Sequence, residues 1–351
     1  MQVILGILYH TIGGISSGSF YMGFKKVKGW AWESMWIVGG LFSWLIVPPI
    51  AAYLTVPNFA DIISTGASSV KTFVFTMGLL WGIGGLTYGL GVRYLGMSLG
   101  NSVVLGFCSA FGSLIPAIYY NFNPAEGKTS FSDLLASSGG QMVLLGVLTC
   151  LIGIAVSGKA GMIKESELTD EQKKTSVTEF SLVKGLIIAI ISGILSSFFN
   201  FGIEGGKPLA EEAVRQGFNP LFQNNVTYVV LLWGGLTTNF IWCMYLNFKN
   251  KTFSDYTNQG TPIAKNILFS GLAGTMWFLQ FFFYGMGESK LGNGASSWIL
   301  HMATIILTAN AWGLALGEWK GVSKKAFNTF ILGLALIILS IFLVGIGNSM
   351  K

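Results

Sequence analysis

Ten stretches of about twenty mostly apolar residues, separated by short polar breaks, fill almost the whole of this 351-residue chain. A helix of about 20 residues spans the roughly 30 Å hydrocarbon core of a bilayer. Charged residues make up 10% of the sequence, against roughly 25% in soluble domains, so most of the outer surface must face lipid. The stretches lack the alternation of a β-barrel. The pattern therefore predicts an all-α membrane protein.

The predicted transmembrane helices follow one another closely, and no acidic or basic domain interrupts them. Short breaks such as Arg93 to Gly96 indicate tight helical hairpins, because lipid leaves exposed backbone polar groups unsatisfied. Cys108, Cys150 and Cys243 lie within apolar stretches and are interpreted as small buried hydrophobes. The ten predicted helices are 3–24, 32–54, 72–93, 97–120, 139–158, 182–203, 222–247, 265–287, 295–317 and 326–348.

Basic residues are distributed unequally between the two sets of connections. Fifteen Lys and Arg residues follow odd-numbered helices and six lie on the other side. Cytoplasmic connections carry the excess of positive charge, so both termini are predicted outside. The net charge of +6 is explained by this orientation, and no basic patch indicates nucleic-acid binding.

The longest charged break, from Lys159 to Lys184, falls after the fifth predicted helix. It divides the chain into a first five-helix repeat (1–158), a cytoplasmic linker (159–181) and a second five-helix repeat (182–351). Because five is odd, two homologous halves must enter the membrane in opposite directions. The sequence therefore predicts two inverted five-helix repeats, as in many secondary transporters.

Helices 139–158 and 326–348 are apolar on all sides and are predicted to be peripheral. The other helices carry polar stripes, which must point inward. Flat aromatic rings pack on the C–H face of a sugar, and amide, hydroxyl and imidazole groups bond its hydroxyls. Packing between buried Trp and Asn side chains is the alternative reading. The stripes are His10, Gly14, Ser17 and Tyr21; Ser98, Ser102 and Ser109; Gly193, Ser196, Asn200, Glu204 and Lys207; Trp277, Gln280, Phe281 and Tyr284; Trp298, His301, Thr308 and Trp312.

From these stripes the predicted sugar contacts are Tyr21, Asn200, Trp277, Gln280, Tyr284 and Trp298. The sequence predicts transport of a polyol-sized ligand.

Ionisable residues within membrane helices are costly and mark substrate or proton paths by default. His10 and His301 are predicted at matching depth, and histidine titrates near neutral pH. Glu204 is expected near Lys207, one turn away, and either Glu204 or Glu33 could relay protons. For Glu33, a solvated or snorkelling position at the membrane surface is favoured. The predicted proton-coupling residues are His10, His301, Glu204 and Glu33.

Motifs for catalysis or ATP use do not occur in the sequence. It has no His-Glu-x-x-His metal helix, no phosphate-binding Gly-x-x-x-x-Gly-Lys loop and no Gly-x-Ser-x-Gly elbow. We therefore expect no enzymatic activity, no cofactor and no metal site, and transport that is ion-coupled or passive.

Several stretches along essentially the full chain form recognisable motifs: Tyr9-His10, Phe24 to Trp36, Leu80 to Gly84, Arg93 to Ser98, Lys207-Pro208, Met276 to Tyr284, Ser297 to Met302 and Glu318-Trp319. Together they resemble the L-rhamnose/proton symporter family. The resemblance implies the drug/metabolite transporter fold and uptake of L-rhamnose with protons across the bacterial inner membrane. Two departures from the family pattern are Glu204-Gly205-Gly206 and a short connection from Gly285 to Ser296.

Two alternatives remain open at this point. The same architecture could carry another polar metabolite or sugar, and could export it. A non-transporting membrane receptor or structural protein is disfavoured by the number of inward polar stripes. The glycine stripes permit a homodimer without requiring one.

Overall fold

Ten helical segments long and apolar enough to cross a bilayer make up the computed structural model. The structure describes residues 1–95, 97–124, 129–167, 182–315 and 319–350, and in these ranges every regular element is a helix. The number of predicted transmembrane helices is thereby confirmed. The connection between the third and fourth spans falls at residue 96, outside the described residues, as does most of the predicted linker.

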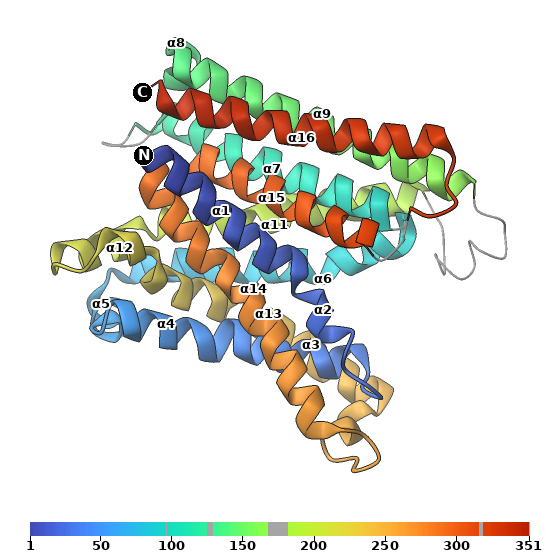
Figure 1. Ribbon diagram of the computed structural model, residues 1–351. Coiled ribbons are helices and arrows are strands. Elements are labelled where there is room, and N and C mark those ends of the chain that lie inside the picture. The colour runs from blue at the N-terminus through green and yellow to red at the C-terminus, as the bar shows by residue number, and fades with distance from the viewer. Residues whose placement is uncertain (96, 125–128, 168–181, 316–318, 351) are drawn as a thin grey trace.

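The helices pack side by side in one bundle (Figure 1). The first five spans are α1 (Gln2–Ser19) with α2 (Tyr21–Phe24), α3 (Trp32–Gly40) with η1 (Leu41–Ile46) and α4 (Val47–Thr55), α6 (Ser68–Leu95), α7 (Met97–Phe122) and α9 (Ser138–Ser166). The second five are α11 (Leu182–Gly205), α13 (Asn224–Asn250), α14 (Ile263–Leu291), α15 (Gly294–Ala315) and α16 (Lys324–Ser349). Short surface helices are α5 (Phe59–Thr65), α8 (Phe131–Ala136), α12 (Lys207–Arg215), η2 (Pro220–Phe222) and η3 (Thr252–Tyr256).

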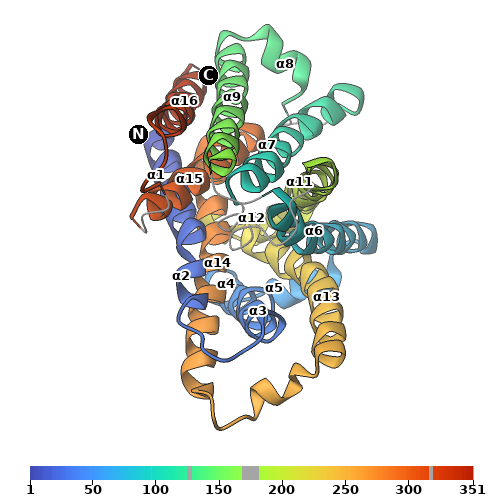
Figure 2. The ribbon, with the colours of Figure 1, turned by 90° about the vertical axis from the view of Figure 1, so that its right-hand side faces the viewer.

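Both chain termini lie at one end of the bundle, which we call the terminal end, together with α5, α8 and α12 (Figure 1). The other end, called the opposite end, carries the connections 25–31 and 251–262. Along the bundle, α9 and α16 pack on each other at one edge (Figure 2). Their large apolar side chains, including Leu148 and Phe342, are exposed, which agrees with the predicted peripheral position.

The second span contains a wide helical turn. Its middle section, η1 (Leu41–Ile46), is a π-helix, and two prolines, Pro48 and Pro49, follow directly. Proline has no N–H to donate and its ring crowds the preceding turn, so a local change of helical pitch relieves the clash. Gly39 lies directly against Gly274 of α14, so that no side chain separates the two backbones at this crossing.

Several helices are longer than the sequence predicted, and two of these extensions matter here. The first residues of the predicted linker, 159–166, continue α9, where the Lys164 ammonium lies 5.0 Å above the Trp319 ring. Helix α14 continues to Leu291, one turn past its predicted end at 287. Only Gly292, with φ of +62°, and Asn293 separate it from α15. The predicted connection from Gly285 to Ser296 was wrong in extent, because most of it is helix.

Candidate functional site

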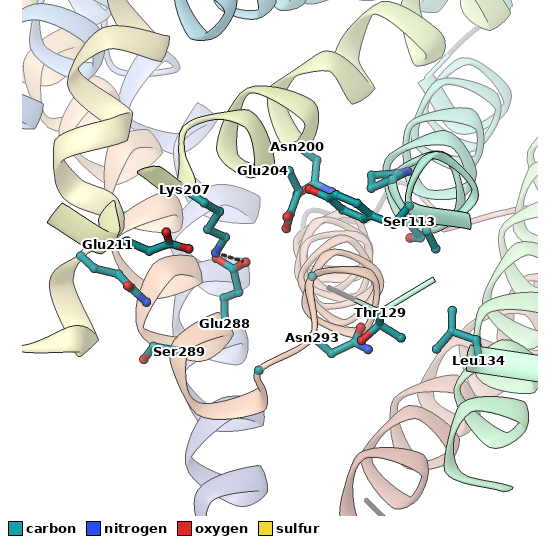
Figure 3. A pocket seen from close by; sticks show the side chains of 16 residues that line it. Ser113, Thr129, Leu134, Asn200, Glu204, Lys207, Glu211, Glu288, Ser289 and Asn293 are labelled. Atoms are coloured by element: carbon teal, nitrogen blue, oxygen red, sulfur yellow. Dashed lines mark hydrogen bonds and ion pairs between the residues drawn. The ribbon is translucent and has the colours of Figure 1, made fainter. Parts of the chain in front are cut away.

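A polar cavity of about 260 Å³ enters the bundle from the terminal end, between α7, α11, α12, α14 and the start of α15 (Figure 3). Glu211 and Gly292 are exposed at its mouth, whereas Asn200 at its base is buried. Its volume is below the roughly 300–1,000 Å³ of drug-sized pockets, so it suits a ligand no larger than a monosaccharide. The lining residues are Ser113, Pro116, Ala117, Tyr120, Thr129, Leu134, Asn200, Glu204, Lys207, Glu211, Gln223, Glu288, Ser289, Gly292, Asn293 and Gly294.

An ion pair between Lys207 and Glu288 forms one wall of the cavity (Figure 3). Lys207 Nζ lies 2.6 Å from Glu288 Oε1, and Asn224 Nδ2 donates to Glu288 Oε2 at 2.6 Å. Both carboxylate oxygens thus accept a strong hydrogen bond, as burial of a charge requires. The expected pairing of Lys207 was with Glu204, its neighbour in sequence. The ion pair that the structure describes for Lys207 is instead with Glu288 on α14.

Glu204 belongs to the same wall. A Cβ atom added to Gly294 would lie 2.6 Å from Glu204 Oε1 and 3.9 Å from Glu288 Oε1, so both carboxylates converge on the start of α15. Helix α11 ends at Gly205 and α12 begins at Lys207, so Lys207 is not on the α11 stripe. The chain turns between them, and both side chains face the cavity (Figure 3).

The base of the cavity is held by hydrogen bonds across helices. Asn200 Nδ2 donates to the carbonyl of Gly112 on α7 at 2.7 Å, and Asn200 Oδ1 accepts from the Tyr284 hydroxyl at 3.2 Å. Below them, Trp298 Nε1 donates to the Cys108 carbonyl at 3.0 Å. Tyr284 and Trp298 are buried and their rings meet edge to face. Asn200 therefore links the open cavity to a closed aromatic layer.

His10 and His301 lie next to each other in this closed layer. Their ring centroids are 5.9 Å apart, and each ring is 5.3 Å from that of Tyr284. Both are fully buried, and among the described residues none of their four ring nitrogens has a hydrogen-bond partner. The two imidazoles are thus neighbours, and their matching depth in the membrane stays a prediction. The two imidazoles occupy the boundary below the cavity and do not line it.

Trp277 and Gln280 lie further along α14, toward the opposite end. Gln280 is buried, and Trp277 packs in an aromatic cluster with Trp44, Trp81 and Phe281. Trp277 and Trp44 also line a second, much smaller hollow of about 10 Å³. Two predicted sugar contacts thus lie on the closed side of the histidine layer.

Tyr21 and Glu33 lie apart from the cavity. Tyr21 is 44% exposed on α2, and its ring contacts that of Phe20 at a tilt of 51°. Glu33 is 5% exposed and accepts hydrogen bonds from Asn250 Nδ2 and Thr252 Oγ1, both at 2.9 Å. The favoured solvated position of Glu33 was wrong, because these partners on α13 and η3 replace water around its carboxylate. Of the predicted serine stripe, Ser109 is buried, and the side chains of Ser98 and Ser102 lie outside the described residues.

The opposite end is closed by cross-helix contacts. Asn266 on α14 accepts from the Lys28 backbone N–H at 3.0 Å and donates to the Lys28 carbonyl at 2.8 Å. Trp312 Nε1 donates to Ser19 Oγ at 2.8 Å, joining α15 to α1. In this structure the polar cavity opens at the terminal end, and these hydrogen bonds join α14 to the connection 25–31 and α15 to α1 at the other end.

Sequence reasoning missed Glu288, Asn224 and Tyr120. Glu288 follows Tyr284 by four residues, as Tyr284 follows Gln280, so the helical period was the signal that could have found it. The early predicted end of the helix concealed that signal. Tyr120 follows Ser109 of the predicted serine stripe by eleven residues, about three helical turns, so the same period could have found it. Asn224 lies on α13, a helix for which no stripe was predicted.

Among the described residues, ten helices long and apolar enough to cross a bilayer, with a polar cavity between them, define a multi-pass membrane protein. The chain belongs to the L-rhamnose-proton symport protein family, whose family model matches residues 1–350. The family model and the relatives that match it are those of transporters and not of enzymes. The L-rhamnose-proton symporter of Yersinia pestis (strain Pestoides F) is 39% identical over 350 residues, covering 98% of each chain. The L-rhamnose-proton symporter of Mannheimia succiniciproducens is 38% identical over 355 residues, covering 99% of this chain and 98% of its own.

Proposed function

We propose that this protein takes up L-rhamnose, or a closely related deoxy sugar, together with protons by alternating access. The observation that carries the proposal is the cavity, which opens at the terminal end and stops at the layer of Tyr284, Trp298 and the two histidines. Its volume suits one monosaccharide, and its lining offers both donors and acceptors. The relatives named as L-rhamnose-proton symporters support the choice of sugar and ion.

The membrane in question is the bacterial inner membrane, with both termini outside. The excess of Lys and Arg in the connections of the opposite end supports this orientation. In that orientation the cavity opens outward and the hydrogen bonds of Asn266 and Trp312 close the cytoplasmic side. The structure then corresponds to the state that receives the sugar from outside.

The two halves, 1–158 and 182–351, form inverted repeats of the drug/metabolite transporter fold. The packing of the helices supports this. Each span of the first half corresponds to the span five places later in the chain. Under this correspondence, the contacts of α1 with α14 and α15 match the contacts of α11 with α6 and α7. The pairs α9 with α16 and α7 with α15 convert into themselves. A pseudo-twofold arrangement of this kind lets one packing geometry serve two opposite openings.

The sugar is bound first by Asn200 at the base of the cavity. Tyr284 and Trp298 close the site beneath it, and Trp277 and Gln280 contact the sugar when the bundle opens toward the opposite end. The aromatic rings provide apolar contact and Asn200 and Gln280 hydrogen bonds. Tyr21, at the mouth of that second opening, contacts the sugar last.

Proton coupling involves His10 and His301, with Glu204 on the cavity side and Glu33 on the cytoplasmic side. The contact between the two imidazoles supports their acting as one unit, since a proton on either repels a proton on the other. Their burial beneath the cavity requires a rearrangement before solvent reaches them.

Radiolabelled L-rhamnose uptake into proteoliposomes under an imposed pH gradient tests this function. Accumulation should follow the gradient, and L-rhamnose should make the external medium more alkaline. Both effects should fall in His10→Ala and in His301→Ala. Coupling at the wild-type level in both variants would contradict the role given to the histidines.

Transport of another polar metabolite, or export, is the alternative, and the charged lining of the cavity favours it over a receptor role. Thermal unfolding in the presence of L-rhamnose, other deoxy sugars, amino sugars and hydrophobic drugs separates the candidates. A ligand that binds the native state raises the unfolding temperature with its concentration. Stabilisation by an amino sugar and not by L-rhamnose would refute the proposed substrate.

A further inference from the structure

Three charged side chains from three helices meet on one wall of the cavity: Glu204 of α11, Lys207 of α12 and Glu288 of α14 (Figure 3). The ammonium of Lys207 contacts Glu288 at 2.6 Å, and oxygens of Glu204 and Glu288 both lie within 4 Å of one point above Gly294. We call Glu204 and Glu288 the carboxylate pair. The one ammonium on this wall pairs with Glu288, and Glu204 lies close to the same point.

The charges of this wall do not balance. Among the described residues that line the cavity, Lys207 is the cation, whereas Glu204, Glu211 and Glu288 are anions. Three carboxylates against one ammonium leave this wall with a net negative formal charge. The Glu288 side chain is only 6% exposed, so water screens it little.

The groups that face Glu288 come from every helix around it. Lys207 and Asn224 bond its two oxygens, while Glu204 and Tyr120 also line the cavity. The remaining titratable neighbours are Glu211 at the mouth, Tyr228 of α13, Tyr284 one turn below on α14 and His10 of α1, which lies against Gly287. Lys207 is the cation among these groups that pairs directly with a carboxylate of the wall.

Glu288 lies between the open cavity and the closed aromatic layer. It lines the cavity, whereas His10 and His301 are fully buried beneath it. Its next turn on α14 carries Tyr284, whose hydroxyl bonds Asn200 and whose ring contacts both histidines. A change in the charge of Glu288 therefore acts one helical turn from the proposed sugar site.

We propose that Glu288 binds the transported proton from the cavity and that Lys207 then moves its ion pair to Glu204. This rests on the proposed function, because it names the proton site of that symport. The proton adds to a carboxylate oxygen of Glu288 from hydronium in the cavity, and Lys207 remains an ammonium throughout. On the other side of the membrane the proton leaves to water, and Lys207 returns to Glu288.

The test compares two assays of the full-length protein in proteoliposomes. Counterflow of labelled L-rhamnose without a gradient measures sugar exchange alone, and accumulation under a pH gradient measures coupling. A gradient of one unit sustains about 10-fold accumulation per coupled proton. For Glu288→Gln we expect counterflow within about threefold of wild type, but accumulation reduced to the equilibrium level. Glu288→Asp, which keeps a carboxylate, should recover part of the accumulation.

Glu212→Gln is the matched control, since Glu212 lies on the same short helix α12 and pairs with Arg215 outside the cavity. It should keep both activities. The double variant Glu288→Gln with Lys207→Met removes both charges of the ion pair together. Neither member of that pair then remains as a buried charge without its partner. It should fold and exchange L-rhamnose without accumulating it.

Gradient-driven accumulation at the wild-type level in Glu288→Gln or in the double variant would overturn the proposal. Loss of counterflow in a folded double variant would also overturn it, because the charged pair would then serve sugar binding. Failure of the wild-type protein to exchange L-rhamnose would instead refute the proposed function.

Discussion

The imidazole of His10 lies against the backbone of Gly287, so closely that a Cβ on Gly287 would sit 2.6 Å from Nε2. Only glycine leaves room for the imidazole at this position, so the absence of a side chain at Gly287 lets α1 and α14 pack closely. We expect Gly287→Ala to displace His10 and lower the stability of the protein by about 1–3 kcal/mol, as overpacking does. Thermal unfolding and L-rhamnose uptake should both decrease.

Gly85→Ala serves as the control for that substitution. Gly85 is also within a transmembrane helix, α6, but a Cβ there meets no atom within 4 Å. Alanine has a higher helix propensity than glycine, so this change should leave stability equal or slightly higher. Equal stability of the two variants would contradict the close packing of His10.

Tyr284→Phe removes the hydroxyl that bonds Asn200 Oδ1 at 3.2 Å. Because the hydroxyl and its partner are buried, we expect a loss of about 0.5–1.5 kcal/mol in unfolding free energy. If Asn200 binds the sugar, its freed oxygen should also shift the KM for L-rhamnose. Tyr245→Phe, at a position 51% exposed on α13, should change neither quantity. An unchanged KM in Tyr284→Phe would contradict the proposal that Asn200 binds the sugar.

Asn266→Ala removes both hydrogen bonds to the backbone of Lys28 and so weakens the closure of the opposite end. At about 1 kcal/mol per bond, the equilibrium should shift toward opening at that end by roughly 10- to 100-fold. A cysteine introduced by Ser43→Cys reports on opening at that end. Ser43 lines the small hollow beside Trp44 and Trp277, and the three native cysteines are buried. Its rate of alkylation should increase in Asn266→Ala, and an unchanged rate would exclude these bonds from the gate.

Asp133 forms a capping box with Ser130 at the start of α8, outside the membrane-spanning helices. Hydrogen bonds from the Ser130 hydroxyl and backbone N–H lower the pKa of Asp133 below its ordinary value. Because the folded-state pKa is the lower one, the box is intact above the ordinary pKa and is lost as pH falls through the folded value. Carboxyl NMR titration should show the lowered pKa, and Ser130→Ala should raise it. An equal pKa in both proteins would contradict the box.

The sequence predicted the transmembrane helices well because each is determined locally. Within lipid a segment such as 326–348 can satisfy its backbone only by bonding to itself, so hydrophobic length is enough to define α16. Asn200 and Tyr284 are buried, as their stripes predicted, because they cannot face hydrocarbon and helical periodicity fixes their direction. Tyr21 and Trp312, which belong to two other predicted stripes, are 44% and 37% exposed. Periodicity alone could not separate the cavity-lining Asn200 from the more deeply buried Gln280.

What only the tertiary structure decided is the partner of each charge. Glu288 remains helical and buried because Lys207 and Asn224, 81 and 64 residues away in the chain, neutralise and bond it. Glu33 is buried for the same reason, through Asn250 and Thr252. Local sequence determines whether a segment crosses the membrane, whereas the cost of burying a charge depends on groups that folding brings together. Hydrophobic length thus specified the helices, and long-range electrostatic pairing specified the cavity between them.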